Sequence, residues 1–329
     1  MKDVVRWGIL GTGWIAHRMA EALAVLPDAE LAAIGSRTGE RAESFGRTFD
    51  VPLRFDRYEN LVSCPDLDVV YVATPHVFHH RDATLALRAG KPVLCEKPLT
   101  VNAREAKGLV AVARSEGLFL MEAMWTRFVP AIVGLREWIA AGAIGEVHSM
   151  IADIGWAQRY DPESRIYNPD LAGGALLDVG VYPVSLASML LGTPAAVSGV
   201  MHPAPTGVDA KCAVSLAYAS GAVAAFVATL PVNTPRDLLV VGSEGWIRVH
   251  PPITRPEGLT RGSHGGSKET VELPMLGNGY THEAVAVMDC LREGKLENEV
   301  MPLDESISIM ETLDAIREPW GLRYPADEG

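Results

Sequence analysis

The chain has 329 residues, of which 48% are hydrophobic, and its formal net charge is −12. Single hydrophobic cores stop growing near about 250–300 residues, so this length suggests two domains. The acidic balance and the lack of a clustered Lys/Arg run argue against a nucleic-acid or anionic-membrane surface, because phosphate binding needs such clusters.

The four cysteines are scattered along the chain and form no CxxC pair. This spacing favours reduced thiols in a cytoplasmic protein and argues against a zinc site. No stretch of the sequence reaches the ~18 consecutive apolar residues of a membrane span.

Short apolar runs alternate with amphipathic stretches in the first third of the chain. Such alternation is typical of a parallel sheet with crossover helices. The runs that predict strands are Val4–Leu10, Leu31–Ser36, Val69–Thr74, Val93–Glu96 and Leu118–Met121.

The rhythm changes near Trp125. A helix is predicted around Ala131–Ala141, and β-branched or alternating segments follow it. Ser220-Gly221 and Ser243-Glu244-Gly245 indicate hairpins, so this second sheet should be mostly antiparallel. Its predicted strands are Val147–Ile154, Cys212–Tyr218, Ala222–Ala228, Leu238–Val241 and Trp246–Val249.

Three later segments predict helices: Leu176–Leu191, Thr281–Arg292 and Leu303–Arg317. The Gly/Ser-rich span Glu257–Lys268 predicts a mobile loop.

A glycine-rich turn follows the first predicted strand and opens a helix, with the pattern GxGxxA from Gly11 to Ala16. Gly11 permits the tight turn, Gly13 lets backbone N–H groups approach a pyrophosphate, and Ala16 lets the helix pack on the strand. The helix N-terminus then favours the anion. The alternative is a structural glycine turn without a ligand.

The position that would hold the ribose 2′-hydroxyl of NAD carries no carboxylate. The chain has Ser36-Arg37 there, followed by Arg41. A guanidinium suits a 2′-phosphate, so the sequence favours NADP, with NAD as the other possibility. Alternatively, Arg37 stacks on adenine or is solvated.

Lys97 and Tyr182 could supply acid/base chemistry from two separate regions. Free tyrosine titrates near ~10, and a cation nearby lowers an acidic pKa by roughly 1–3 units. Lys97 precedes Pro98 at the end of a predicted strand, and Asp178 shares a helix face with Tyr182. The alternatives are a solvated Lys97 paired with Glu96, a Tyr182 that closes the core, and an Asp178 that only caps or pairs locally.

The cluster His76, His79 and His80 lacks nearby acidic partners, so a cofactor-edge loop or exposed imidazoles explain it better than a metal site. Trp125, Trp156 and Tyr280 lie beside motif segments. They either pack in the core or form the wall of a substrate site.

Together these motifs resemble the Gfo/Idh/MocA oxidoreductase family over nearly the whole chain, and they are specific as a set. Phe119–Phe128 and Met301–Ser306 are similar to its dimeric dihydrodiol dehydrogenase and NADP-dependent aldose dehydrogenase branch. The motifs common to the family are the GxGxxA turn, Thr74-Pro75 with His79, Glu96-Lys97-Pro98 and Gly173–Tyr182.

The resemblance implies an α/β protein with a Rossmann domain, residues 1–124, and a C-terminal α/β domain, residues 125–329. The second domain would carry an open, mostly antiparallel sheet that forms a homodimer or homotetramer. Lys97 would touch nicotinamide ribose and substrate, Tyr182 would move the proton, and Asp178 would orient substrate or Lys97. Many relatives have a His in place of Tyr182, which makes inositol-type substrates less expected here.

We therefore expect an NADP(H)-dependent oxidoreductase for a small polyhydroxylated or carbonyl substrate, an aldose-type sugar or a trans-diol. A glycosidase that retains NAD and a non-catalytic NADP sensor remain alternatives. Expected substrate contacts are Trp125, Arg127, Trp156 and Tyr280, and expected cofactor contacts are Gly11, Thr12, Gly13, Trp14, Ile15, Ser36, Arg37, Arg41, Thr74, Pro75, His79, Glu96 and Lys97.

Overall fold

The computed structural model describes residues 4–328, and the chain divides into two compact units. The first unit comprises Met1–Trp125 and Leu276–Ile307, and the second comprises Thr126–Met275 and Ser308–Gly329. The sequence analysis assigned the whole of 125–329 to the second domain. In the structure, Leu276–Ile307 instead belongs to the unit that the N-terminal residues form.

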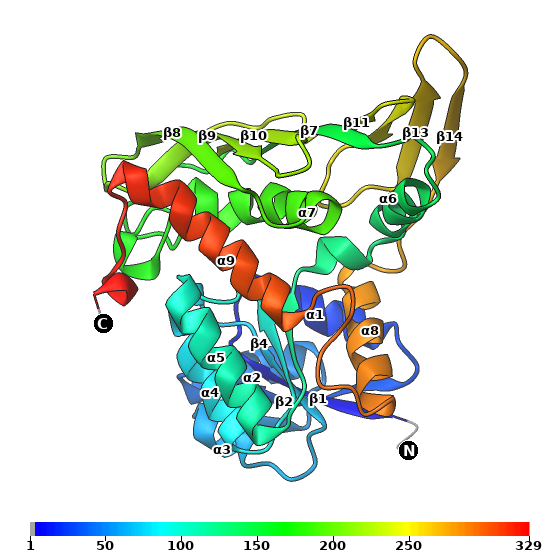
Figure 1. Ribbon diagram of the computed structural model, residues 1–329. Helices are drawn as coiled ribbons and strands as arrows, with labels where there is room; N and C mark the ends of the chain where they lie inside the picture. Colours follow the sequence, from blue (N-terminus) through cyan, green and yellow to red (C-terminus); the bar gives the residue numbers. More distant parts are fainter. Residues whose placement is uncertain (1–3, 329) are drawn as a thin grey trace. The chain divides into compact units, whose positions relative to one another are not determined.

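The first unit is built on a six-stranded parallel sheet with the strand order β3-β2-β1-β4-β5-β6 (Figure 1). The order reverses between β1 and β4, and dinucleotides bind at such switch points in open α/β sheets. Helices cover the sheet, which confirms the predicted Rossmann fold. The strands are β1 (Val5–Leu10), β2 (Ala29–Gly35), β3 (Leu53–Phe55), β4 (Val69–Val72), β5 (Val93–Glu96) and β6 (Leu120–Ala123).

Five of these six strands match predicted strands. The short β3 was not predicted, because three residues of mixed burial carry no periodic signal. The helices of this unit are α1 (Trp14–Ala24), α2 (Gly39–Thr48), α3 (Tyr58–Val62), α4 (His79–Arg88), α5 (Ala103–Glu116) and α8 (Tyr280–Arg292).

Polar contacts fasten the returning segment Leu276–Ile307 to this unit. The Asn278 side chain donates to the carbonyl of Arg18 at 2.7 Å. Arg292 pairs with Asp28 at 2.5 Å. Figure 1 shows α8 beside α1. The sequence analysis missed this assignment because contacts between residues more than 250 positions apart leave no local pattern.

The second unit is built on an eight-stranded sheet with the order β14-β13-β12-β11-β7-β10-β9-β8. Its strand pairs are antiparallel except β10 with β7, as the hairpin signals predicted. The strands are β7 (Val147–Gly155), β8 (Ala196–Pro203), β9 (Asp209–Ala217), β10 (Val223–Thr229), β11 (Leu238–Gly242), β12 (Gly245–Val249), β13 (Gly258–Ser263) and β14 (Lys268–Glu272).

The expected mobile loop Glu257–Lys268 is wrong, because β13 and the start of β14 form a hairpin there. Gly262 in β13 lies opposite Trp246 in β12, and a Cβ on Gly262 would come within 2.6 Å of the indole. Gly262, one of the glycines that suggested a loop, instead makes room for an aromatic ring on the neighbouring strand.

The predicted helix Leu176–Leu191 is not one regular α-helix. Leu176–Gly180 forms a π-helical turn, and α7 (Val181–Leu191) continues from it. The helical stretch Pro169–Leu191 is long and apolar enough to cross a membrane by length and composition, but 72% of its most apolar window is buried. It is therefore a core helix, and Figure 1 shows α7 along the sheet.

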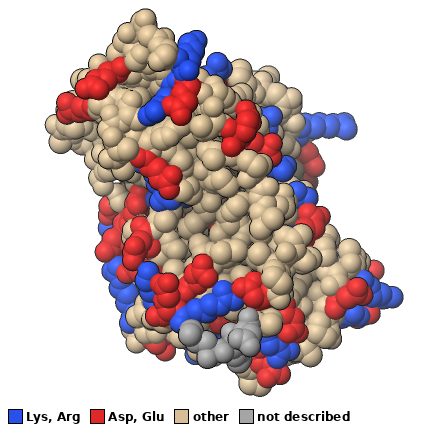
Figure 2. All heavy atoms as spheres, turned by 90° about the vertical axis from the view of Figure 1, so that its right-hand side faces the viewer, with Lys and Arg blue, Asp and Glu red and all other residues tan. Residues whose placement is uncertain are grey.

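Two further helices have their predicted bounds within one residue: α6 (Pro130–Ala140) and α9 (Leu303–Arg317). On the face drawn in Figure 2, basic side chains are interspersed with acidic ones and form no continuous basic patch. The net charge of −12 agrees with this distribution.

Candidate active site

The two glycines of the glycine-rich turn, Gly11 and Gly13, are required for different reasons. Gly11 has φ +105°, and a Cβ there would lie 2.8 Å from the carbonyl oxygen of Ala73. The fold itself therefore requires glycine at this position. A Cβ on Gly13, by contrast, would meet no atom of the described chain within 4 Å. The open space beside Gly13 suits the close approach of a ligand to the backbone.

The start of α1 is prepared for an anion. Gly13 is its N-cap, and among residues 4–328 no side chain caps this helix end and no acidic residue lies in its first turn. Helix N-termini leave backbone N–H groups without intrahelical partners and carry partial positive charge. Thr12 is half-buried, Trp14 is exposed and Ile15 is half-buried at this end.

Thr74 and Pro75 follow β4 at the carboxyl edge of the sheet. Thr74 is buried, and its Oγ1 has no hydrogen-bond partner within the described part of the chain. A bound dinucleotide would explain a buried hydroxyl without a hydrogen-bond partner in the segment that lies beside Gly11. The residues of this edge therefore fit a dinucleotide.

His79 has backbone partners for both of its ring nitrogens. Its ring is buried, with Nδ1 2.9 Å from the Pro98 carbonyl oxygen and Nε2 2.8 Å from that of Thr74. The imidazole thus bridges the loops after β4 and β5. Both ring nitrogens therefore lie against backbone carbonyls, and the predicted cofactor contact of His79 stays a prediction.

His76 is also buried, and no group of three His, Cys, Asp or Glu side chains in residues 4–328 is arranged to hold a metal ion. His76 and His79 lie edge to face, with ring centroids 6.3 Å apart.

Ser36, Arg37 and Arg41 follow β2. Ser36 is buried and its N–H donates to the Phe55 carbonyl at 3.0 Å, whereas Arg37 and Arg41 are exposed. Thr38 caps α2 by accepting from the Arg41 N–H at 3.4 Å. Two guanidinium groups therefore flank a helix N-terminus at the end of the strand where an adenosine ribose is expected.

Glu96 and Lys97 end β5. The buried Glu96 carboxylate accepts a hydrogen bond from the Tyr71 hydroxyl, and its Oε2 accepts from the Lys97 backbone N–H at 3.2 Å. Burial, followed by the charge of Glu96, holds the pKa of Tyr71 well above its usual value, so this phenol remains a donor. The Tyr71 hydroxyl and the Lys97 backbone N–H thus hold the Glu96 carboxylate in place. Lys97 follows it at the sheet edge and is half-buried.

Glu283 in α8 is a buried acid that the sequence analysis missed. It is fully buried, and neither carboxyl oxygen has a hydrogen-bond partner among the residues that the structure describes. Burial, and then the charge of Glu96, raises the pKa of Glu283 well above its usual range. Glu283 therefore holds its proton more tightly than an exposed carboxyl group does. The sequence around Glu283 contains no motif that marks it as a functional residue, because it lies on an ordinary amphipathic helix.

Trp125 and Tyr280 are brought together although they are far apart in sequence. Their rings stack with centroids 4.3 Å apart and an interplanar angle of 21°. Both side chains are almost fully buried, and both residues belong to the first unit. This stack belongs to the predicted substrate set, as does Trp156, which is half-exposed in the second unit under the Arg236 guanidinium.

Arg127 was expected to contact substrate, but the structure gives it another task. It is fully buried, its Nε donates to Ser185 Oγ at 2.8 Å, and its Nη2 donates to the Ser185 carbonyl at 2.6 Å. Arg127 therefore anchors α7.

Asp178 and Tyr182 lie on the π-helical turn and the first turn of α7. Asp178 accepts a hydrogen bond from Arg165 Nη2 at 2.9 Å, and Tyr182 is almost fully buried. Arg165 is a neighbour that the sequence analysis did not name, since it lies in an irregular loop without a motif. The ion pair orients the Asp178 carboxylate within the second unit.

Two family models match this chain. Residues 5–124 match the oxidoreductase family with an NAD-binding Rossmann fold, and residues 132–248 match the Gfo/Idh/MocA C-terminal domain. A mouse trans-1,2-dihydrobenzene-1,2-diol dehydrogenase is 37% identical, over 98% of this chain and 99% of its own. The D-xylose 1-dehydrogenase (NADP⁺) of Hypocrea jecorina is 36% identical over 98% and 93%.

Solved structures agree with these matches. The 3-ketoreductase KijD10 from Actinomadura kijaniata, in complex with NADP and TDP-benzene, is 29% identical, with a TM-score of 0.86 over 96% of this chain and 97% of its own. The aldose–aldose oxidoreductase of Caulobacter crescentus is 27% identical, with a TM-score of 0.87 over 96% and 98%. The two family models together cover more than half of the chain, and the two dehydrogenases are 36–37% identical over 98% of it, so the chain belongs to the Gfo/Idh/MocA family of oxidoreductases.

Proposed function

We propose that this protein is an NADP(H)-dependent oxidoreductase acting on a CH–OH or C=O carbon of an aldose-like sugar or a trans-diol. The observation that carries this proposal is the coverage of the match. The diol and xylose dehydrogenases align with 98% of the chain, so the substrate-binding half resembles theirs as well as the dinucleotide-binding half.

The choice of NADP over NAD is supported by Arg37 and Arg41. Both are exposed: Arg37 lies just after β2, where a carboxylate would stand in an NAD-specific site, and Arg41 lies in the first turn of α2. Guanidinium groups pair well with a 2′-phosphate. The Gly13 backbone, the free start of α1 and the Thr74 hydroxyl would hold the rest of the dinucleotide.

The proton transfer is assigned to Tyr182, assisted by Lys97. When bound, the nicotinamide ring supplies or accepts the hydride. In oxidation, the Tyr182 phenolate takes the substrate hydroxyl proton, while the Lys97 ammonium stabilises the phenolate and the developing alkoxide. In reduction, the Tyr182 phenol returns that proton. Asp178, held by Arg165 at 2.9 Å, would orient substrate or Lys97.

The stacked pair Trp125 and Tyr280, together with Trp156, is proposed to face the substrate. Aromatic surfaces suit the apolar faces of sugar rings and diols. Arg127 is left out of this set because Ser185 occupies its guanidinium.

The open face of the eight-stranded sheet is proposed as a homo-oligomer interface. Val200 on β8, Val223 and Val227 on β10 and Ile151 on β7 are between 45% and 70% exposed. Several of their cross-strand neighbours, such as Ala213 and Ala225, are small and uncharged, and one charged neighbour, Asp153, lies opposite Val227. Exposed apolar patches of this kind mark interaction surfaces.

A cytoplasmic location is proposed from the cysteines. All four are buried and free, which suits a reducing compartment.

The experiment that tests the proposed function is an absorbance screen at the reduced-nicotinamide band. NADP⁺ and NAD⁺ are each offered with aldoses, inositols and diols. The proposal expects reduction of NADP⁺ with an aldose or a trans-diol, and weak reduction of NAD⁺. Sugar release without net cofactor reduction would instead indicate a glycosidase, and tight NADPH binding without turnover on the whole panel would indicate a sensor.

A further inference from the structure

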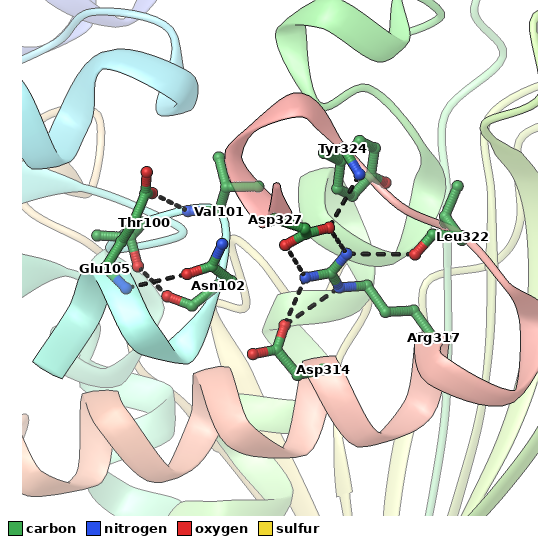
Figure 3. A network of polar contacts seen from close by, with 9 residues as sticks. All are labelled: Thr100, Val101, Asn102, Glu105, Asp314, Arg317, Leu322, Tyr324 and Asp327. Atoms are coloured by element: carbon green, nitrogen blue, oxygen red, sulfur yellow. Dashed lines mark hydrogen bonds and ion pairs between the residues drawn. The ribbon is translucent and has the colours of Figure 1, made fainter. Parts of the chain in front are cut away.

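The end of the chain folds into a buried polar network around Arg317, the last residue of α9 (Figure 3). The Arg317 guanidinium forms two hydrogen bonds with the Asp327 carboxylate, at 2.5 and 2.8 Å. It also donates to Asp314 at 2.7 Å and to the Leu322 carbonyl at 3.2 Å. Such a forked arginine–carboxylate pair fixes geometry as well as charge. Residues 317–327 therefore form a closed, rigid loop.

This loop places the Tyr324 ring in the core of the second unit. Asp327 accepts a hydrogen bond from the Tyr324 backbone N–H at 2.9 Å, and the Arg317 guanidinium lies 5.2 Å from the centre of the Tyr324 ring. Tyr324 is 2% exposed. Burial, and then the charge of Asp209, holds the pKa of Tyr324 well above its usual value, so its hydroxyl remains a hydrogen-bond donor.

The acceptor of that hydrogen bond lies in the turn that precedes the helical stretch carrying Asp178 and Tyr182. The Tyr324 hydroxyl donates to the Gly173 carbonyl at 2.8 Å. The next residue, Gly174, has φ +126°, and a Cβ there would lie 3.2 Å from the Tyr324 hydroxyl and would collide with Asp209. Tyr324 and Asp209 thus fill the space that the missing side chain leaves.

Asp209, at the start of β9, holds the same turn from the other side. It is fully buried, and its Oδ2 accepts a hydrogen bond at 2.7 Å from the backbone N–H of Leu176, the first residue of the π-helical turn. Two side chains from distant parts of the sequence therefore hold the Gly173–Leu176 turn. Tyr182 follows six residues after Leu176 on the continuous helical stretch.

We infer that the C-terminal loop 317–327 is a positioning element for Tyr182, acting through the hydrogen bond from Tyr324 to the Gly173 carbonyl. This inference rests on the proposed function, because it gives the loop a role in proton transfer. Tyr324 acts on the start of the helical stretch and is a positioning residue. A misplacement of about 1 Å at a reacting group can cost about 10²-fold in rate, so a looser turn should lower turnover by roughly tenfold.

The test compares Tyr324→Phe with a matched control from the same end of the chain. Tyr324→Phe removes one hydroxyl and keeps the ring beside Arg317. The control is Trp320→Phe, which removes the hydrogen bond from Trp320 Nε1 to the Gly199 carbonyl on β8, 3.0 Å long. Both variants lose one hydrogen bond between the C-terminal segment and its unit, but only Tyr324→Phe touches the Gly173 turn.

Two readouts separate positioning from stability. We expect Tyr324→Phe to speed backbone hydrogen exchange across residues 174–182 and to lower kcat roughly tenfold, with an unchanged KM for NADPH. Trp320→Phe should change neither. Three results would overturn the inference. Tyr324→Phe could show wild-type exchange and wild-type kcat, or faster exchange with wild-type kcat. Alternatively, Tyr324→Phe and Trp320→Phe could lose the same fraction of kcat.

The variant Tyr182→Phe distinguishes this inference from the proposed function. If Tyr182→Phe is inactive and Tyr324→Phe has wild-type kcat, only the positioning role is overturned. If Tyr182→Phe keeps wild-type turnover, the proton-transfer role proposed for Tyr182 fails, and the positioning of Tyr182 for catalysis fails with it.

Discussion

Replacing Asp209 with Asn should change how the stability of the protein depends on pH. Asp209 is fully buried, and burial raises the pKa of its carboxyl from 3.8 to about 7, although the backbone N–H groups of Leu176 and Ala175 work in the opposite direction. The unfolded chain releases this proton near its ordinary pKa. Between about pH 4 and pH 7 the folded state therefore binds more protons than the unfolded state.

The sign follows from this difference. Asp209 contributes most to folding below about pH 4, and its contribution is lost progressively as the pH rises through its folded pKa of about 7. A difference of about three pKa units corresponds to about 4 kcal/mol, of which about 2–3 kcal/mol falls between pH 5 and pH 8. Asn keeps the acceptor for the Leu176 N–H but has no proton to lose.

The assay is urea unfolding of the wild type and Asp209→Asn at pH 5 and pH 8. Other carboxyl groups titrate alike in both proteins, so the difference in unfolding free energy isolates Asp209. We expect the variant to gain about 2–3 kcal/mol relative to the wild type between the two pH values. An equal difference at both pH values would refute the reasoning that the Asp209 proton is retained in the folded state.

Three further substitutions test other parts of the structure. Gly11→Ala should destabilise the free protein by about 1–3 kcal/mol because of its positive φ, whereas Gly13→Ala should leave Tm unchanged but weaken NADPH binding in a fluorescence titration; equal effects on Tm would contradict this. Arg37→Ala should raise KM for NADP⁺ roughly 10- to 100-fold with KM for NAD⁺ unchanged, since a charged hydrogen bond contributes about 1.5–3 kcal/mol; parallel changes for both cofactors would remove the argument for NADP. Val227→Arg on the open sheet face should shift the protein towards monomer in sedimentation velocity, and an unchanged sedimentation coefficient would exclude this face as the interface.

Much of the fold could be predicted from the sequence because many of its helices and strands follow from the local pattern of apolar and polar residues. The buried parallel strand β4 and the first three residues of β5 are continuous apolar runs. The alternation of buried and exposed residues in β9 and β10 indicates one buried and one open face. The hairpin β13–β14 was missed because Gly262 makes room for Trp246, and a contact with another strand leaves no local pattern in the sequence.

The sequence predicted those residues of the candidate site whose role follows from the local motif around them. It did not predict the roles of residues that depend on contacts with distant parts of the chain. Gly11 and Gly13 were found from their spacing. Three features depend on residues that meet only after folding: the burial of Arg127 against Ser185, the ion pair of Asp178 with Arg165, and the raised pKa of the buried Glu283.

The central claim is that Tyr182, assisted by Lys97, transfers the proton. Steady-state turnover and NADPH affinity of Tyr182→Phe test it most directly. We predict a fall in kcat of about 10²–10⁴-fold with unchanged NADPH affinity. Wild-type turnover, or loss of NADPH binding in place of turnover, would contradict the claim.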